Sequence, residues 1–385
     1  MSFTNNQTLL IVKFVLAPDK FKGSLTGFEF CDVVEEGILT VLPEAEILKV
    51  PLADGGDGTI DILDYHLHGE RMVVTVKDPL FRPVQASYLF IASTQTAFIE
   101  MAEASGMKLL SPDDQNCFYT STYGTGELIL DAIKKGAKNI ILGIGGSATN
   151  DGGIGMASAL GIKFLDREVN EVIPIGKNMS EIEKIENTLA LKNLNQITFK
   201  VACDVTNPLY GENGAAHVYA AQKGANANEI SLLDKGLKNM ANLFKDQFDI
   251  DIQSVKGAGA AGGLGAGASV LLNAQLISGI DLIKELIGFD YKIRNADWLI
   301  TGEGKLDLQT LSGKTIQGVL SSSKKYNIPV AAFCGSISLS PKELHKVGIS
   351  YAASIVEKAE SLEDAMMNSS KYLKKISTAF VKSLY

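Results

Sequence analysis

The chain has 385 residues, of which 46% are hydrophobic and 21% charged, and its formal net charge is −8. This length is enough for two or three domains, and the composition is that of a globular protein. The negative charge and the lack of basic runs argue against nucleic-acid binding. The sequence contains no run of about 18 apolar residues, so we expect no membrane span. We also expect no signal peptide, because the first ten residues lack a basic region followed by an apolar one.

The four cysteines are scattered, with no close pair: Cys31, Cys117, Cys203 and Cys334. Zinc ribbons and redox dithiols are therefore disfavoured, and we expect a reducing, cytoplasmic location. His66 and His68 could chelate a metal, but such a pair near a helix end is more often a surface feature. Chemistry based on carboxylates and lysines is the better hypothesis.

Strands and helices alternate over the first 70 residues. The predicted elements there are strands at 11–17 and 46–52 and helices at 27–42 and 60–68. Ser24 or Thr26 would cap the first helix, and Glu29 would complete a capping box with Thr26. The loop after the first strand also carries Lys20 and Lys22, which could form a cationic pocket for a carboxylate or phosphate.

The middle of the chain begins with a β-rich pattern and then returns to mixed elements. The predicted strands are 72–76, 84–92, 95–100, 139–142, 163–165 and 198–202. We expect the first three of these strands to be antiparallel. The predicted helices are 128–135, 156–160, 228–244 and 268–276, with surface helix and connection at 179–194.

Strands and helices alternate again at the C-terminal end, with strands at 297–300, 329–333 and 351–356 and helices at 315–326 and 361–384. Alternation at both ends of a chain is typical of one parallel sheet. We therefore predict an α/β fold with two domains. Residues 1–70 and 293–385 form a Rossmann-like domain, residues 71–292 form an inserted mixed α/β domain, and the active site lies in the cleft between them.

Two glycine-rich segments are conspicuous. Residues 143–153 follow an apolar run and read Gly-Ile-Gly-Gly-Ser-Ala-Thr-Asn-Asp-Gly-Gly. A tight turn would explain the glycines, whereas the polar residues between them suit a turn that holds a phosphate or a metal. Residues 257–267 are almost all glycine and alanine, and a helix packed very closely on a neighbour would explain them.

Carboxylates recur in the loops that follow the predicted strands: Asp19, Asp54, Asp57, Asp151, Asp204, Glu303 and Asp307. Open α/β sheets bind their ligands at this end of the strands. The mixture of carboxylates, lysines and glycines suits Mg²⁺-assisted phosphoryl transfer, in which Mg²⁺ takes oxygen ligands while lysines and backbone N–H groups neutralise phosphate charge.

Two nucleotide motifs are matched only in part. Gly143-x-Gly145-x-x-Ala148 fits the dinucleotide fingerprint, with Asp166 near the ribose-binding distance, but 257–262 fits it as well. An NAD-dependent oxidoreductase is thus the alternative function, and a sugar-acid binding protein a weaker third. The sequence at 312–315, Ser-Gly-Lys-Thr, fails as a P-loop because its leading glycine is replaced by Leu308, although Lys314 could still meet an anion at a helix N-terminus.

Taken together, these segments resemble the type I glycerate kinases. The segments that carry the resemblance are 17–26, 51–59, 123–128, 143–153, 203–211, 222–225, 257–263 and 301–310. The resemblance implies a two-domain α/β kinase that transfers the ATP γ-phosphate to D-glycerate with Mg²⁺, with 2-phosphoglycerate favoured over 3-phosphoglycerate as the product. Two positions depart from the pattern, since Lys20 stands where serine is expected and Asp57 where glutamate is common.

We assign hypothetical roles to residues in these segments. Asp204 would orient or deprotonate the acceptor hydroxyl, and Lys305 would contact the transferred phosphate. The remaining assignments are Lys22, Ser24, Asp54 and Asn150 for glycerate, with Lys22 near its carboxylate; Gly145, Gly146, Ser147, Gly302 and Lys314 for the nucleotide; and Asp151 and Asp307 for Mg²⁺. The partners are thus glycerate and ATP, and a homodimer is left open.

Overall fold

The computed structural model describes residues 11–21, 23–56, 58–186, 194–307 and 315–385. The chain folds into two compact units: unit 1, up to Asp54 and from Ile283 to Tyr385, and unit 2, Gly55–Leu282. The divisions fall earlier than the boundaries predicted at 70 and 292. One reason is that helix α2 (Thr59–Leu67) packs on strands β4 (Pro83–Ile91) and β5 (Thr96–Glu100) of unit 2.

Unit 1 contains a five-stranded sheet among its described residues, in the order β15-β13-β11-β1-β2, with every neighbouring pair parallel. This is the parallel α/β sheet predicted from the two chain ends. Its elements are β1 (Lys13–Leu16), α1 (Gly27–Leu39), β2 (Glu46–Lys49), α11 (Phe289–Lys292), β11 (Trp298–Thr301), β12 (Lys305–Leu306), α12 (Thr315–Tyr326), β13 (Val330–Cys334), β14 (Ser336–Ile337), α13 (Pro341–Val347), β15 (Ile349–Ser354), α14 (Leu362–Met367) and α15 (Ser369–Lys382).

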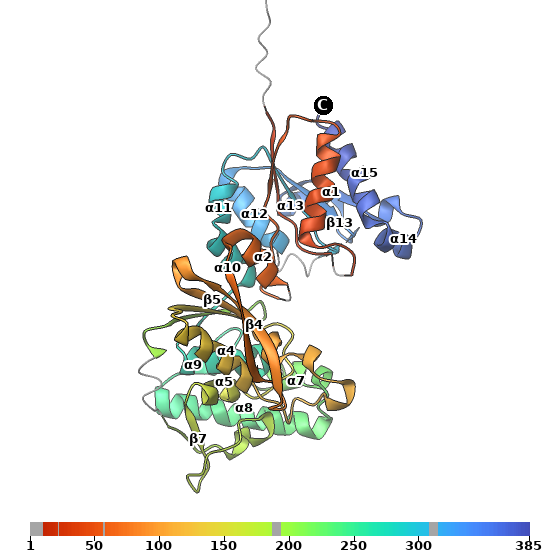
Figure 1. Cartoon of the computed structure of the whole chain (residues 1–385). Coiled ribbons are helices and arrows are strands. Elements are labelled where there is room, and N and C mark those ends of the chain that lie inside the picture. Colours follow the sequence, from red (N-terminus) through yellow and green to blue (C-terminus); the bar gives the residue numbers. More distant parts are fainter. Residues whose placement is uncertain (1–10, 22, 57, 187–193, 308–314) are drawn as a thin grey trace, which may run out of the picture. The chain divides into compact units, whose positions relative to one another are not determined.

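The core of unit 1 forms where α1 and α15 pack together on the sheet (Figure 1). Phe30 of α1 and Phe380 of α15 are fully buried there with Phe14 and Phe333 of the strands. Burying such a side chain stabilises a fold by about 1.5–3 kcal/mol. Helix α1 begins where predicted, because Thr26 and Glu29 form the expected capping box.

Unit 2 contains a six-stranded mixed sheet in the order β10-β9-β6-β5-β4-β3, antiparallel at β3–β4–β5 and parallel from β5 to β10. The antiparallel pairing of the β-rich segment is thus confirmed. The elements not yet given are β3 (Glu70–Lys77), α3 (Ala102–Ser105), α4 (Tyr123–Lys134), β6 (Asn139–Gly143), α5 (Ile154–Ala159), β7 (Lys163–Leu165), β8 (Lys184–Glu186), β9 (Thr198–Ala202), α7 (Ala215–Tyr219), α8 (Ala227–Phe248), α9 (Ala260–Leu271), β10 (Gln275–Ile277) and α10 (Gly279–Ile287), which crosses into unit 1.

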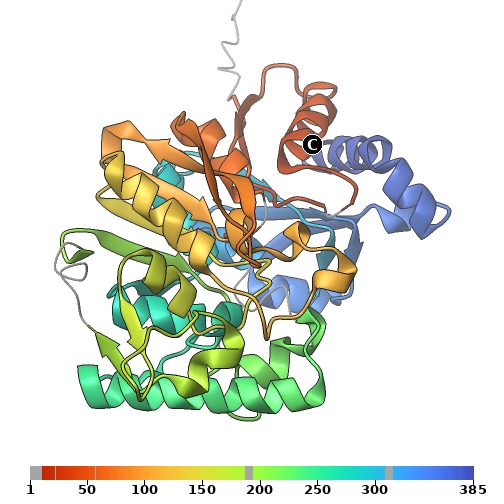
Figure 2. The ribbon, with the colours of Figure 1, turned by 60° about the horizontal axis from the view of Figure 1, so that its bottom comes forward.

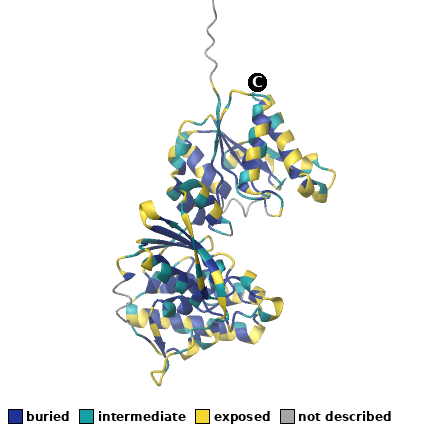
Figure 3. Ribbon diagram, viewed as in Figure 1, coloured by how far each residue is buried: buried dark blue, intermediate teal, exposed yellow. Residues whose placement is uncertain are grey.

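Helices α4, α5 and α9 bury their apolar residues against one face of this sheet. A second apolar cluster lies under the long helix α8, which runs along the outside of unit 2 (Figure 2). The burial pattern follows this arrangement, since strands β5 and β6 are mostly buried while α8 exposes one side (Figure 3). In the part of the chain that the structure describes, no helix is long and apolar enough to cross a membrane.

Helix α4 begins at Tyr123, five residues before the predicted start at 128, because two glycines that favour a loop belong to the helix. A Cβ on Gly124 would collide with the carbonyl oxygen of Lys77, and one on Gly126 with that of Met156. These glycines therefore let α4 pack directly on the backbone of neighbouring segments.

Two other predicted helices were wrong in extent. The helix predicted at 268–276 is instead α9, which ends at Leu271 and is followed by strand β10. The helix predicted at 361–384 is divided into α14 and α15 at Asn368, which has non-helical φ and ψ angles of −111° and 26°. Asp364 spans this break, because it accepts hydrogen bonds from Asn368 Nδ2 at 2.8 Å and from the Tyr372 hydroxyl at 2.6 Å.

The two glycine-rich segments pack against each other in unit 2. The Gly152 amide donates to the Gly262 carbonyl at 3.0 Å, and the first turn of α9 has left-handed backbone at 261–263. A Cβ on Gly262 would also lie far inside van der Waals contact with the Thr149 carbonyl oxygen. The close packing predicted for 257–267 is thus confirmed, and the neighbour is the loop 143–153.

This packing predicts a large cost for Gly262→Ala. The substitution adds strain at φ +69° and a clash with rigid backbone, so we expect a loss of about 2–5 kcal/mol in the free energy of unfolding by urea. Gly211→Ala is the matched control, because Gly211 has φ +93° but nothing within 4 Å of its Cβ position, and about 1–2 kcal/mol is expected there. Equal losses at both positions would contradict the packing explanation.

Candidate active site

The loop 143–153 continues from β6 at the carboxyl end of the unit 2 sheet. It lies beside the loop that opens unit 2, since a Cβ on Gly143 would meet the Gly55 carbonyl oxygen at 2.9 Å and one on Gly145 would meet Gly56 Cα at 3.5 Å. Gly146 has φ +69°, and its carbonyl accepts from Met107 N at 3.0 Å. Glycines at these positions therefore allow several backbone segments to meet at one edge of the sheet.

Asp151 is fully buried in this loop and accepts four hydrogen bonds. The donors are Thr122 N at 2.7 Å, Thr122 Oγ1 at 2.8 Å, Gly153 N at 3.1 Å and Gly155 N at 3.2 Å. Burial raises the pKa of Asp151, whereas these hydrogen bonds favour its ionised form. A carboxylate offers about four acceptor positions, so this geometry favours Asp151 as the anchor of α4 and α5.

The two residues before Asp151 have polar groups without a partner. Asn150 is fully buried, and neither its amide oxygen nor its amide nitrogen is hydrogen-bonded within the described part of the chain. The Thr149 hydroxyl is also buried and has no hydrogen-bond partner among the described residues. Buried polar groups are normally hydrogen-bonded, and each exception requires an explanation, such as a ligand.

Lys223 is a functional candidate to which sequence reasoning gave no role, although its segment 222–225 carries part of the family resemblance. Only 5% of the residue is exposed, and its Nζ donates to Ser147 Oγ at 2.6 Å and to the Thr149 carbonyl at 2.8 Å. Within the described ranges no carboxylate forms an ion pair with it. Burial lowers the pKa of Lys223 to about 8, against smaller opposing effects of Cys117 and Asp151.

Asp204 follows β9 at the same sheet edge and is exposed. Its Oδ1 accepts from Gly279 N at 2.9 Å, at the first residue of α10. This contact fixes the carboxylate at a helix N-terminus, where a negative charge is favourable.

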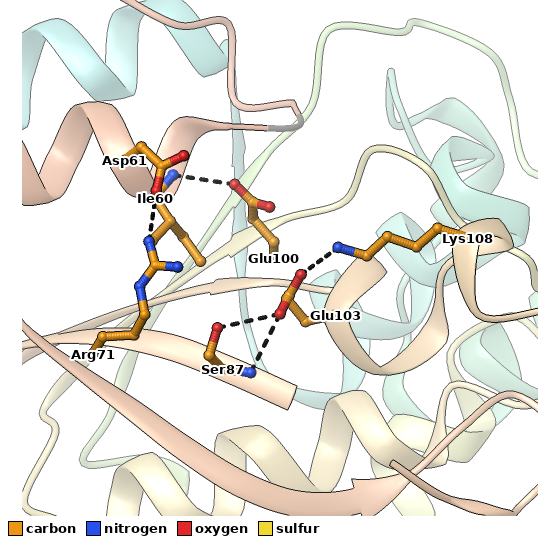
Figure 4. A network of polar contacts seen from close by, with 7 residues as sticks. All are labelled: Ile60, Asp61, Arg71, Ser87, Glu100, Glu103 and Lys108. Atoms are coloured by element: carbon orange, nitrogen blue, oxygen red, sulfur yellow. Dashed lines mark hydrogen bonds and ion pairs between the residues drawn. The ribbon is translucent and has the colours of Figure 1, made fainter. Parts of the chain in front are cut away.

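Two further carboxylates lie at this edge, Glu100 as the last residue of β5 and Glu103 shortly after it (Figure 4). Glu100 is nearly buried and accepts from Ile60 N at 3.1 Å, in the first turn of α2. Glu103 accepts from Ser87 Oγ at 3.2 Å and forms an ion pair with Lys108. Glu100 thus connects α2 to the sheet, and Glu103 connects α3 to β4.

A second group of polar residues lies at the carboxyl end of the unit 1 sheet. Asp19 accepts from Lys20 N at 2.7 Å and from Thr315 Oγ1 at 2.6 Å, at the start of α12. Burial raises the pKa of Asp19, and the charge of Asp54 raises it further. Gly302 lies beside this group, because Asp19 N donates to its carbonyl at 2.8 Å.

Three other predicted residues of unit 1 lie in exposed or half-buried positions. Lys305 is exposed and forms an ion pair with Asp307 at 3.0 Å. Ser24 Oγ donates to the Met366 carbonyl at 3.3 Å. Lys22, Asp57 and Lys314 lie outside the described residues.

The predicted site residues therefore fall into two groups. Unit 2 holds Gly145, Gly146, Ser147, Asn150, Asp151 and Asp204, whereas unit 1 holds Ser24, Asp54, Gly302, Lys305 and Asp307. Over the described residues, no three His, Cys, Asp or Glu side chains gather as a metal site. A Mg²⁺ bound through one or two carboxylates and substrate phosphates needs no such cluster.

Residues 14–385 match the family model of the glycerate kinase family. The chain belongs to the glycerate kinase family. It is 43% identical over 359 residues to a glycerate kinase of Halalkalibacterium halodurans, covering 93% of this chain and 94% of that protein. It is also 40% identical to a glycerate 2-kinase of Escherichia coli, covering 92% and 93%.

A crystal structure described as that of a glycerate kinase 2 from Salmonella typhimurium LT2 has the same fold. The TM-score is 0.87 at 38% identity, and the match covers 97% of this chain and 98% of that one. The glycerate kinase family thus accounts for residues 14–385, and the dinucleotide interpretation of 143–148 loses its structural basis. A dinucleotide turn leads directly into a helix, whereas α5 begins only at Ile154.

Lys223→Met tests the unfavourable burial of the ammonium group. The folded-state pKa of about 8 lies below the ordinary value of 10.5, so between these pH values the unfolded chain binds more protons than the folded one. Wild-type stability should therefore rise with pH in this window, relative to the variant, by on the order of 3 kcal/mol. Urea unfolding of both proteins at about pH 7 and about pH 10 measures this difference, and parallel changes would contradict the assignment.

Proposed function

We propose that this chain catalyses the ATP-dependent phosphorylation of D-glycerate with Mg²⁺, giving 2-phosphoglycerate. The observation that carries the proposal is the family match over residues 14–385, which includes every segment that we assign to the site. The name of the Escherichia coli relative, a glycerate 2-kinase, supports phosphorylation at O2. All four cysteines are free thiols, in keeping with the cytoplasmic location that we also propose.

Asp204 is the proposed base or orienting group for the acceptor hydroxyl. Its exposure makes it accessible to a substrate, and the Gly279 amide fixes one carboxylate oxygen. A positioned carboxylate that removes or directs the hydroxyl proton typically accelerates the reaction by about 10²–10⁴-fold.

The phosphate charge requires cations, and Lys305 is the proposed protein contact. Its exposed side chain forms an ion pair across the surface with Asp307, and such exposed pairs cost little to rearrange. Of the two carboxylates predicted for Mg²⁺, Asp307 has the more suitable surroundings, because Asp151 already accepts four hydrogen bonds. Asp307 would hold the ion, which when bound would supply positive charge against the charge that develops on the phosphate.

The remaining proposed contacts follow the sequence assignments. Lys22, Ser24, Asp54 and Asn150 would hold glycerate, and Gly145, Gly146, Ser147, Gly302 and Lys314 would line the nucleotide. Asn150 has the best structural support among them, since its buried amide has no protein partner among the described residues. Gly302 also has a packing role, because a Cβ there would collide with the Phe333 carbonyl oxygen.

A product assay tests the proposed reaction. With Mg-ATP and D-glycerate, we expect ADP release that needs both the metal and glycerate. Added enolase alone should then yield phosphoenolpyruvate if the product is 2-phosphoglycerate. Phosphoenolpyruvate that forms only after a phosphoglycerate mutase is also added would show the 3-phosphate instead. Absence of ADP release, with NADH binding detected by fluorescence, would favour the oxidoreductase alternative.

Asp204→Asn tests the role of this carboxylate. The asparagine oxygen can still accept from Gly279 N, so we expect an unchanged fold with kcat reduced by about 10²–10⁴-fold. Asp234→Asn is the matched control, because Asp234 Oδ1 also accepts a backbone N–H, from Gly211 at 2.7 Å, and has no role in the proposed site. Turnover of Asp204→Asn within a few-fold of wild type would exclude Asp204 as the base.

A further inference from the structure

The strongest unexplained feature of the molecule is a set of buried polar groups on Lys223 and on the loop that its Nζ contacts, which we call the Lys223 cluster: Ser147, Thr149, Asn150 and Lys223. An ammonium group has three N–H donors, and only two of those of Lys223 have an acceptor among the described residues. No carboxylate pairs with it there. A lysine buried in this way carries a charge that no ion pair among the described residues offsets.

The backbone around Lys223 is held in place on both sides. The Cys117 amide donates to the Lys223 carbonyl at 3.0 Å, and Gly224 has φ +88° with its Cβ position blocked by the Gln115 carbonyl. On the other side, the Asp151 anchor and the contact between Gly152 and Gly262 fix the loop that carries Thr149 and Asn150. The Lys223 cluster is therefore a rigid arrangement, as a binding site requires.

The unpaired groups define the chemistry of a ligand. The third N–H of Lys223 needs an acceptor, preferably an anionic one. The Asn150 amide needs both an acceptor for its NH₂ group and a donor for its oxygen. The Thr149 hydroxyl can act as a hydrogen-bond donor or as an acceptor. Carboxylates and ionised phosphates only accept hydrogen bonds. The ligand must therefore combine an anionic group with a hydroxyl, as a small hydroxy acid does.

We infer that Lys223 binds the carboxylate of the acceptor substrate, while the buried amide of Asn150 bonds a hydroxyl of the same molecule. This inference rests on the proposed function and deepens it. It gives Lys223 the carboxylate contact that the sequence assigned to Lys22. A triphosphate fits less well, because it has no hydroxyl on its phosphates and would bring several negative charges to a single ammonium near the buried Asp151.

The test compares D-glycerate with its neutral amide, D-glyceramide, in wild type and Lys223→Met. Methionine has nearly the length of lysine but no charge, so it should leave the fold intact. In wild type we expect kcat/KM for glycerate to exceed that for the amide by about 100-fold, because losing one partner of a buried charge pair is costly. In the variant this ratio should fall to about 1, with the KM for ATP within about threefold of wild type.

Lys292→Met is the matched control, because burial also lowers the pKa of Lys292 and it has no role in the proposed site. It should retain the wild-type ratio. Thermal unfolding of both variants separates a loss of fold from a loss of binding. If Lys223→Met lowers activity while the ratio is unchanged, or raises the KM for ATP instead, the inference is overturned. If wild type releases no ADP with glycerate, the proposed function itself fails, and the two failures are thus distinguishable.

Discussion

The buried carboxylate of Asp151 is the interaction on which the polar loop of unit 2 depends. It accepts hydrogen bonds from Gly155 N at the start of α5 and from Thr122, the residue that precedes α4 and lies 29 positions earlier in the chain. Removing a group that satisfies several buried donors is much more destabilising than the net worth of each hydrogen bond suggests. The positions of Thr149 and Asn150, directly before Asp151, follow from this anchor. The glycines on either side matter because they let the second glycine-rich segment close over the loop.

The two sheets present charge in different ways at the same end of their strands. In unit 1, Lys305 and Asp307 form an exposed ion pair that solvent screens. In unit 2, Lys223 is buried beside hydroxyl and carbonyl oxygens, where a charge interacts much more strongly with any ligand that reaches it. An exposed cation suits a contact that forms and breaks during turnover, whereas a buried one suits discrimination between a charged substrate and its neutral analogue.

Sequence reasoning reached the fold because local patterns agree with it. The capping box at Thr26, the antiparallel β-rich segment and the alternation of strands and helices at both ends are all set by residues close together in the sequence. Sequence reasoning missed the features that depend on contacts between residues far apart in the chain. Lys223 stands in a short segment without charged neighbours, and its partners lie 74 and 76 positions earlier. Likewise, Gly124 and Gly126 favour a loop by propensity, and only their contacts with Lys77 and Met156 place them in a helix.

The chain order of unit 1 has a consequence for biosynthesis. Strand β1 lies between β2 and β11, so one side of it pairs only with residues near the other end of the chain, as Phe14 does with Trp298. A nascent chain emerging from the ribosome therefore carries β1 and α1 with their apolar faces uncovered until all of unit 2 has been translated. Unit 2 is continuous in sequence and can fold during this interval. During this interval the apolar residues of β1 and α1 are open to aggregation and to chaperones.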